Sequence, residues 1–292
     1  RDRIGEIALK RGDRTAVSRI DRIRIVEAGR DVIRFDALAE ANGTTAATVH
    51  FRITPNDEPA GVAIDYTSEG LDGWEVTRVR LLDGALALTE TEAGTVYIPH
   101  RLGIERAAAR GLPGREQWRT YDSLSMAMCG AVKQGSALLL SWSDVNTRLS
   151  VVADWPDAPR VPGRHLRTVS LDIGAPNGGC GLYPLGAGGY VDIAKAYRSC
   201  AETKGWRQTW AQKRLTFPTV NQLAGTINFK PFVLSRVVPG SRFCTDGKER
   251  IHLGFTFDEA AACAEHWRHD LGIDRASVVL AGWINGGYDV RH

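Results

Sequence analysis

The chain has 292 residues, of which 43% are hydrophobic and 24% are charged, and this composition is typical of a globular protein with one large or two ordinary domains. Its 37 basic and 34 acidic side chains leave a formal net charge of +3. That balance predicts neither a nucleic acid nor a membrane surface as a partner. Because no apolar run reaches the ~18 residues that a membrane-spanning helix needs, no such helix is expected.

Residues 1–185 contain many short stretches in which apolar and polar side chains alternate, as they do in strands with one buried face. Gly, Asp, Asn and Pro turns separate these stretches, and the spacing predicts an antiparallel β-sandwich. Arginines crowd the first thirty residues, but interspersed acids favour a solvated face over a phosphate-binding arm. The expected strands are 22–26, 46–53, 75–82, 84–90, 94–98, 123–132, 136–142, 148–153 and 166–172.

Glycines dominate residues 174–189 (GAPNGGCGLYPLGAGG), just before an expected helix at 190–204. Backbone N–H groups at a helix N-terminus can bind an anion. The GxGxxG and GK[ST] patterns of nucleotide sites are absent, however, so a flexible connector is the favoured interpretation. Gly205 is placed to end the helix, and residues 186–223 are expected to form a linker that contains it.

Five cysteines are present, an odd number without CxxC or Cys/His spacing. This pattern argues against a zinc site and against a full disulfide framework, and no metal or cofactor is expected. Cys129 and Cys263 lie in apolar contexts that are typical of core residues. The cysteines slightly favour a cytoplasmic setting but leave the localisation open.

Residues 224–292 begin with an apolar strand at 224–237, continue with an amphipathic helix at 257–271, and reach a buried strand at 276–283. A Gly-rich polar loop follows the second strand. This order is the opening of a β/α barrel or of a doubly wound sheet, in which ligands bind at that loop. A barrel needs roughly 250 residues, whereas 292 − 224 + 1 = 69 are present from Ala224 onward. We therefore expect a fragment of a larger protein, with an incomplete barrel at 224–292.

The loop after the second strand carries the candidate binding residues Trp283, Asn285, Tyr288 and Asp289. Sugars need a flat apolar surface for their C–H face and charged acceptors for their hydroxyls, and this set offers both. The competing interpretation is a core tryptophan followed by an ordinary turn. Lys230 interrupts the first apolar strand and could either bind a substrate hydroxyl or extend to solvent.

Three segments carry a family resemblance. Residues 190–198 (YVDIAKAYR), 227–232 (INFKPF) and 283–289 (WINGGYD) follow the β-sandwich in that order. The chain thereby resembles bacterial glycoside hydrolases similar to α-N-acetylgalactosaminidases and endo-α-N-acetylgalactosaminidases. In those enzymes a mutarotase-like supersandwich precedes a β/α barrel.

The resemblance implies a retaining glycosidase whose nucleophile and acid/base residues lie on later barrel strands. No catalytic residue is assigned in this chain, because the matching positions are missing. Asp289 is the implied binder of sugar hydroxyls, with Trp283 or Tyr288 lining the subsite.

The favoured function is the N-terminal part of a glycoside hydrolase acting on α-linked galactose-type or N-acetylgalactosamine-type sugars. Its expected partners are the carbohydrate substrate and the remaining barrel segment of the same protein. Two alternatives stay open: a non-catalytic carbohydrate-binding sandwich, and a mutarotase-like isomerase. The isomerase would need a histidine and a carboxylate paired in the concave face of the sandwich, and the sequence does not place such a pair.

Overall fold

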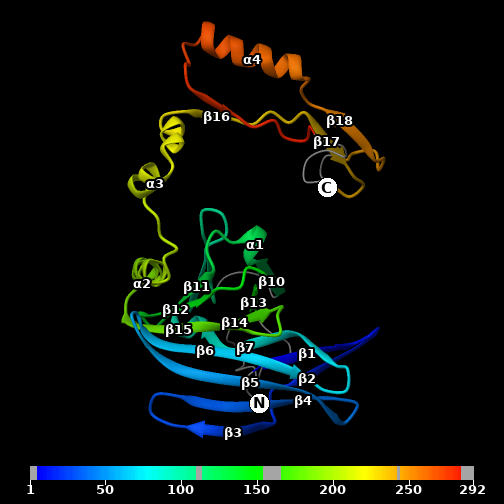
Figure 1. Ribbon diagram of the computed structural model, residues 1–292, viewed down its shortest axis with the longest axis vertical. Helices are drawn as coiled ribbons and strands as arrows, with labels where there is room; N and C mark the ends of the chain where they lie inside the picture. The colour runs from blue at the N-terminus through cyan, green and yellow to red at the C-terminus, as the bar shows by residue number, and fades with distance from the viewer. Residues whose placement is uncertain (1–4, 110–113, 154–165, 242–243, 284–292) are drawn as a thin grey trace. The chain divides into compact units, whose positions relative to one another are not determined.

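The computed structural model describes residues 5–109, 114–153, 166–241 and 244–283 (Figure 1). The chain divides into two compact units, Arg1–Arg207 and Gln208–His292. Each unit is described by itself. Within the described residues, no helix is long and apolar enough to cross a membrane.

The first unit contains two antiparallel sheets. The smaller sheet has six strands in the order β10-β13-β14-β7-β1-β2, and the larger has nine in the order β3-β4-β5-β6-β15-β12-β11-β8-β9. The strands of the first unit are β1 (Gly5–Arg11), β2 (Arg14–Arg19), β3 (Ile23–Ala28), β4 (Ile33–Ala41), β5 (Thr44–Asp57), β6 (Ala60–Gly70), β7 (Glu75–Thr89), β8 (Thr95–Ile98), β9 (Ile104–Ala107), β10 (Gly114–Arg119), β11 (Met128–Lys133), β12 (Ser136–Trp142), β13 (Arg148–Ala153), β14 (Leu166–Ile173) and β15 (Gly178–Ala187). Its helices are η1 (Glu90–Glu92), α1 (Thr120–Ser123) and α2 (Tyr190–Thr203).

One hydrophobic core joins the two sheets, so the predicted β-sandwich is confirmed. In the smaller sheet Ile7 and Leu171 are fully buried, and in the larger sheet Val49 and Trp142 are, all within one cluster. Alternation along each strand supplies these side chains, because successive residues point to opposite faces. Fully burying one such aliphatic side chain stabilises the fold by about 1.5–3 kcal/mol.

A second, smaller core lies on the opposite face of the larger sheet, where α2 packs over β11, β12 and β15. Ile193 of α2 is buried there beside Leu139. Gly130 makes this approach possible, because a Cβ at that position would lie 2.8 Å from Ile193 Cδ1. The helix expected at 190–204 is thus observed, and Gly205 follows it with φ +68°.

Residues 178–187 are not a flexible connector, as the sequence had suggested, but β15, which pairs with β6 and β12. The glycines of β15 allow neighbouring atoms to approach its backbone closely. A Cβ at Gly179 would lie 2.4 Å from Ile64 O, and one at Gly181 would lie 2.3 Å from Tyr183 Oη. Glycine here makes room for neighbouring atoms, one of the roles it takes inside strands.

Two further strand boundaries differ from the predicted ones. The strands expected at 75–82 and 84–90 are one continuous strand, β7. Leu82 has φ +60°, and the pairing with β14 shifts register nearby, so the chain bends there without leaving the sheet. The strand expected at 123–132 begins only at Met128, after the short helix α1.

The second unit contains two parallel strands with a helix between them in the sequence, which confirms the predicted strand–helix–strand order. The pairing joins Phe229 to Val278 and continues past the assigned strands, since Ala281 N donates to Pro231 O at 2.9 Å. The elements of this unit are α3 (Trp210–Thr216), η2 (Pro218–Leu223), β16 (Ile227–Phe229), β17 (Leu234–Val237), β18 (Arg250–Leu253), α4 (Phe257–His269) and β19 (Ala276–Val278).

The apolar stretch 224–237 is not one strand, because it divides at Pro231 into β16 and β17. Proline has no N–H to donate to a ladder, so continuous pairing on both sides is blocked there. The stretch 276–283 is not a buried strand either, since Val278 and Val279 are exposed. The described sheet has only two strands, and α4 covers only one of its faces.

Candidate functional site

The candidate site is the face of the parallel pair β16/β19 that points away from α4. The ring of Phe229 packs edge-on against Trp267 of α4 with centroids 4.1 Å apart, which identifies the helix-covered face. Because strand side chains alternate, neighbouring positions lie on the other face. These are Asn228, Lys230, Phe232, Ser277, Val279 and the buried Ala281.

Of the predicted site residues, Lys230 lies on this uncovered face, and Trp283 follows Ala281 beyond Gly282, whose φ of +76° interrupts the alternation. Trp283 is 61% exposed, so its alternative interpretation as a core residue is wrong. Lys230 is exposed, and its Nζ lies 5.6 Å from the ring centroid of Phe232, a cation–π distance. The other predicted residues, Asn285, Tyr288 and Asp289, lie outside the described residues.

A charged hairpin stands at the carboxyl end of the first parallel strand and was not predicted from the sequence. Strands β17 and β18 pair antiparallel, and Gly254 N donates to Val233 O at 2.9 Å, which anchors the base of the hairpin. Arg236 Nε donates to Glu249 Oε1 at 2.7 Å. The alternation in residues 250–253 (RIHL) was the available signal, but its polar composition hid the strand.

The hairpin turn holds one carboxylate in its ionised form. Asp246 accepts hydrogen bonds from the backbone N–H of Lys248 at 3.2 Å and from Arg250 at 2.8 Å. These contacts, led by the backbone N–H of Lys248, lower the pKa of Asp246. The second unit therefore carries an exposed ring beside a cation on the β16/β19 face, and separately a charged hairpin with one ionised carboxylate at its turn.

On the sandwich, one histidine–carboxylate pair lies on the outer face of the larger sheet. His50 Nδ1 lies 2.7 Å from Asp36 Oδ1, and Arg24 donates to Asp36 Oδ2 at 2.5 Å. The hydrogen bond from Arg24, followed by that with His50, lowers the pKa of the buried Asp36 carboxyl. The partly exposed imidazole is thus oriented by a carboxylate, as a general base would be.

A cavity of about 430 Å³ opens beside β7 and the β11–β12 hairpin. Leu86, Leu88 and Leu138 give it aliphatic walls, and it has no aromatic ring in its lining. Lys133 lies at this cavity but is paired with Glu92 at 3.0 Å. The cavity therefore has apolar walls but no aromatic ring on which a ligand could stack.

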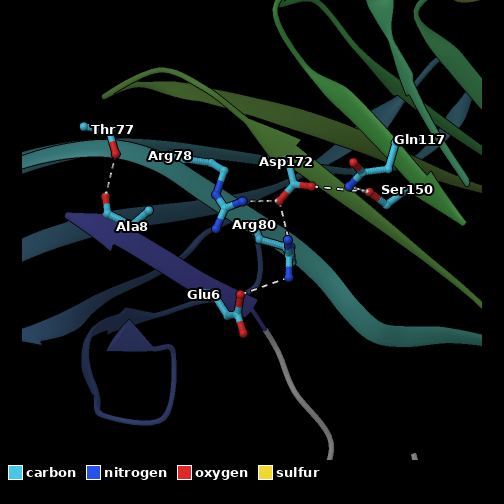
Figure 2. Close-up of polar contacts among 8 residues, drawn as sticks. All are labelled: Glu6, Ala8, Thr77, Arg78, Arg80, Gln117, Ser150 and Asp172. Atoms are coloured by element: carbon cyan, nitrogen blue, oxygen red, sulfur yellow. Dashed lines mark hydrogen bonds and ion pairs between the residues drawn. The ribbon is translucent and has the colours of Figure 1, made fainter. Parts of the chain in front are cut away.

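Two buried charges of the sandwich, Arg80 and Asp172, form the centre of a polar network across the smaller sheet (Figure 2). Arg80 Nε donates to Asp172 Oδ1 at 2.7 Å, and its Nη1 donates to Glu6 Oε2 at 2.9 Å. Gln117 Nε2 donates to Ser150 Oγ at 2.8 Å, and Ser150 Oγ donates to Asp172 Oδ2 at 3.4 Å.

This network links five neighbouring strands: β1, β7, β14, β13 and β10. Asp172 and Arg80 are both buried and both paired. Burial lowers the pKa of Arg80, but the carboxylates of Asp172, Glu6 and Asp83 together outweigh that effect, so the net shift is upward. Mutual satisfaction of this kind favours a structural role that fixes strand register. Within the described chain, no group of three or more His, Cys, Asp or Glu side chains could hold a metal ion.

No protein-family model matches the sequence, and no curated protein matches it. Among solved structures, the fold is similar to that of an alpha-N-acetylgalactosaminidase, NagBb, from Bifidobacterium bifidum. Its GalNAc complex aligns with a TM-score of 0.66 at 18% identity, over 98% of this chain and 48% of that one. The ligand-free form aligns with a TM-score of 0.64 at the same identity and coverage.

This likeness is one of fold. The chain spans about half the length of the glycosidase that it matches. The class that the structure defines is therefore a β-sandwich followed by a parallel β-α-β segment, the architecture of part of a known glycoside hydrolase.

Proposed function

We propose that this chain is the N-terminal part of a glycoside hydrolase acting on α-linked N-acetylgalactosamine-type or galactose-type sugars, with its nucleophile and acid/base residues on barrel strands beyond residue 292. One observation carries the proposal. The β16–α4–β19 segment follows a sandwich whose fold, together with that segment, matches 98% of this chain but only 48% of an alpha-N-acetylgalactosaminidase.

The uncovered face of the parallel pair supports the same assignment. Val279 and Phe232 are 46% and 43% exposed there, and exposed apolar strand faces are typical of surfaces that other chain segments or ligands cover. In a closed barrel this face would turn inward, because helices form the outer ring. Lys230 and Trp283 would then line the interior near the ligand-binding end.

The proposed chemistry needs two carboxylates that flank the glycosidic bond, one as nucleophile and one as acid/base. We assign neither to this chain. Asp289 would bind sugar hydroxyls, Asn285 would add amide hydrogen bonds, and Trp283 or Tyr288 would cover the apolar face of the ring.

Substitution of Asp289 in the full-length gene product tests the binding role. We expect Asp289→Ala to weaken N-acetylgalactosamine binding by ~1.5–3 kcal/mol, the usual contribution of hydrogen bonds to a charged group. Isothermal titration measures this change. Asp274→Ala, an exposed acid before β19, is the matched control and should bind as the wild type does. Unchanged affinity in Asp289→Ala would remove that residue from the site.

A carbohydrate-binding sandwich is the first alternative, and the self-contained core of the first unit favours it. Deleting residues 208–292 separates the two possibilities. Affinity for galactose or N-acetylgalactosamine that survives the deletion would favour the binding module, and its loss would favour the glycosidase.

A mutarotase-like isomerase is the second alternative, and the His50–Asp36 pair is the observation that favours it. Such an enzyme would speed the interconversion of the two anomers of galactose through proton transfer by the imidazole. Polarimetry on fresh α-galactose measures this rate. Acceleration by the wild type that His50→Ala abolishes would establish the isomerase, and no acceleration would exclude it.

A further inference from the structure

Strand β3 forms one edge of the nine-stranded sheet and is exposed along its whole length. Among the described strands it pairs only with β4. Ile25 and Val26 are 56% and 58% exposed, and Ile23 and Ile33 are exposed beside them. An apolar edge strand with free backbone groups is a ready template for pairing with another strand.

The pairing with β4 shows which side chains share a face. Ile23 lies opposite Ala37 and Ile25 opposite Phe35, on the face that becomes the buried core further along the sheet. Val26 is an extra residue that shifts the register. Because the bulge interrupts the alternation, Val26 stays on the apolar face with Ile25, and Glu27 lies on the other face opposite Arg34.

The charges of β3 therefore lie together on the outer face. Arg24 lies opposite Asp36, and Glu27 lies opposite Arg34, with which it forms an ion pair of 3.1 Å. One strand thus presents a cation and an anion on the same face, three positions apart in sequence.

This arrangement is self-complementary for one pairing only. In an antiparallel pair of two β3 strands centred between Ile25 and Val26, Arg24 of each copy lies opposite Glu27 of the second copy. Ile25 then meets Val26 of the second copy on the apolar face. A parallel in-register pair would instead set Arg24 against Arg24 and Glu27 against Glu27, and like charges directly opposite are destabilising.

We propose that two copies of this chain associate through antiparallel pairing of their β3 strands, which joins the two nine-stranded sheets edge to edge. The interface is isologous, since the same strand serves both partners. It satisfies the outward backbone groups of β3 and covers Ile25 and Val26. The proposal is independent of any glycosidase activity.

Sedimentation equilibrium over ~1–200 µM of the 292-residue chain tests the proposal, a range that detects micromolar dimers. We expect a concentration-dependent dimer in the wild type. Ile25→Lys and, separately, Val26→Lys should shift the population to monomer at every concentration, with unchanged circular dichroism. The matched control is Val17→Lys on β2, an exposed valine at the edge of the smaller sheet, and it should leave the dimer intact.

Charge reversal tests the register. Arg24→Glu and Glu27→Arg should each weaken the dimer by more than tenfold, and the double variant should restore it. A wild type that is monomeric throughout, or a dimer that both lysine variants leave unchanged, would overturn the proposal. Single reversals without effect on the dimer would overturn the antiparallel register.

Discussion

The two units of the chain use the same material, alternating apolar strands, with opposite results. In the first unit, residues 149–153 of β13 and 167–173 of β14 are buried on both faces, and the buried polar side chains of Ser150 and Asp172 are hydrogen-bonded to each other. In the second unit, β16 and β19 have the composition of buried strands but remain exposed. A strand sequence specifies which face must be covered, and the neighbouring elements decide whether it is.

Breaking the buried network of the sandwich should have the largest effect on stability. Asp172→Ala leaves the buried Arg80 guanidinium without its closest carboxylate, and we expect the free energy of unfolding to fall by about 3–5 kcal/mol. Urea unfolding followed by fluorescence measures this loss. Asp122→Ala removes a half-exposed partner of Arg119 in the same unit, and it should cost less than about 0.5 kcal/mol. Equal losses in the two variants would contradict the account.

The cysteines of the two units should react with a thiol reagent at different rates. Burial raises the pKa of Cys129 and of Cys180 to about 12, so both stay protonated and enclosed at pH 8. Cys244 and Cys263 of the second unit are partly exposed. We expect a thiol reagent to label the latter pair about 100-fold faster in the native protein. Peptide mass mapping after timed labelling reads this out, and comparable labelling of Cys129 would show that the sandwich core is open.

The same two buried thiols predict a loss of stability at high pH. Their folded pKa of about 12 lies above the ordinary value of about 8.5. The folded state therefore holds more protons than the unfolded state in that interval. Stability is fully present below about pH 8.5 and declines as the pH rises toward 12. Cys129→Ala should flatten the decline in denaturant titrations between these limits, and an unaltered slope would contradict the assignment.

Enlarging Gly130 should disturb the contact between α2 and the sheet. Gly130→Ala places a methyl group 2.8 Å from Ile193 Cδ1, and overpacking of this kind costs about 1–3 kcal/mol. The double variant Gly130→Ala/Ile193→Val removes Cδ1, one of the two Ile193 atoms that clash, and should recover part of the loss. Thermal unfolding compares the three proteins, and a double variant no better than the sum of both single changes would argue against direct contact.

The smallest expected effect concerns Asp36 at low pH. Arg24 and then His50 hold the pKa of this carboxyl below its usual range. Because the folded pKa is depressed, the stabilisation is present above about pH 4 and is lost as the pH falls through the folded pKa. We expect Asp36→Asn to cost about 1 kcal/mol or less at pH 6, since Arg24 is largely exposed. The cost should shrink as the pH falls below about 4 and through the folded pKa, and a cost that does not change with pH would contradict the assignment.

Alternation and turn residues were enough to predict the sandwich, because most of its strands have one face in the core. They failed at β15, where glycines that make room for Tyr183 and Ile64 resemble a linker. They failed again at β7, where Asp83-Gly84 resembles a turn but lies within a strand. Local composition does not distinguish a glycine that gives flexibility from one that gives space.

The candidate site was predictable only in part. Its position after a strand pointed to Trp283, and alternation along the first parallel strand placed Lys230 on the uncovered face. Phe232 was missed, because an aromatic residue in an apolar strand gives no sign of which face it occupies. The Arg80–Asp172 pair was likewise hidden, since the two residues are 92 positions apart and meet only through strand pairing.

The central claim is that the parallel segment of this chain is the opening of a sugar-cleaving barrel. Release of p-nitrophenol from the α-N-acetylgalactosaminide and the α-galactoside tests it most directly, with the full-length gene product and the 292-residue chain assayed side by side. The account predicts hydrolysis of at least one substrate by the full-length protein and none by residues 1–292. Hydrolysis by the 292-residue chain alone, or by neither protein, would contradict it.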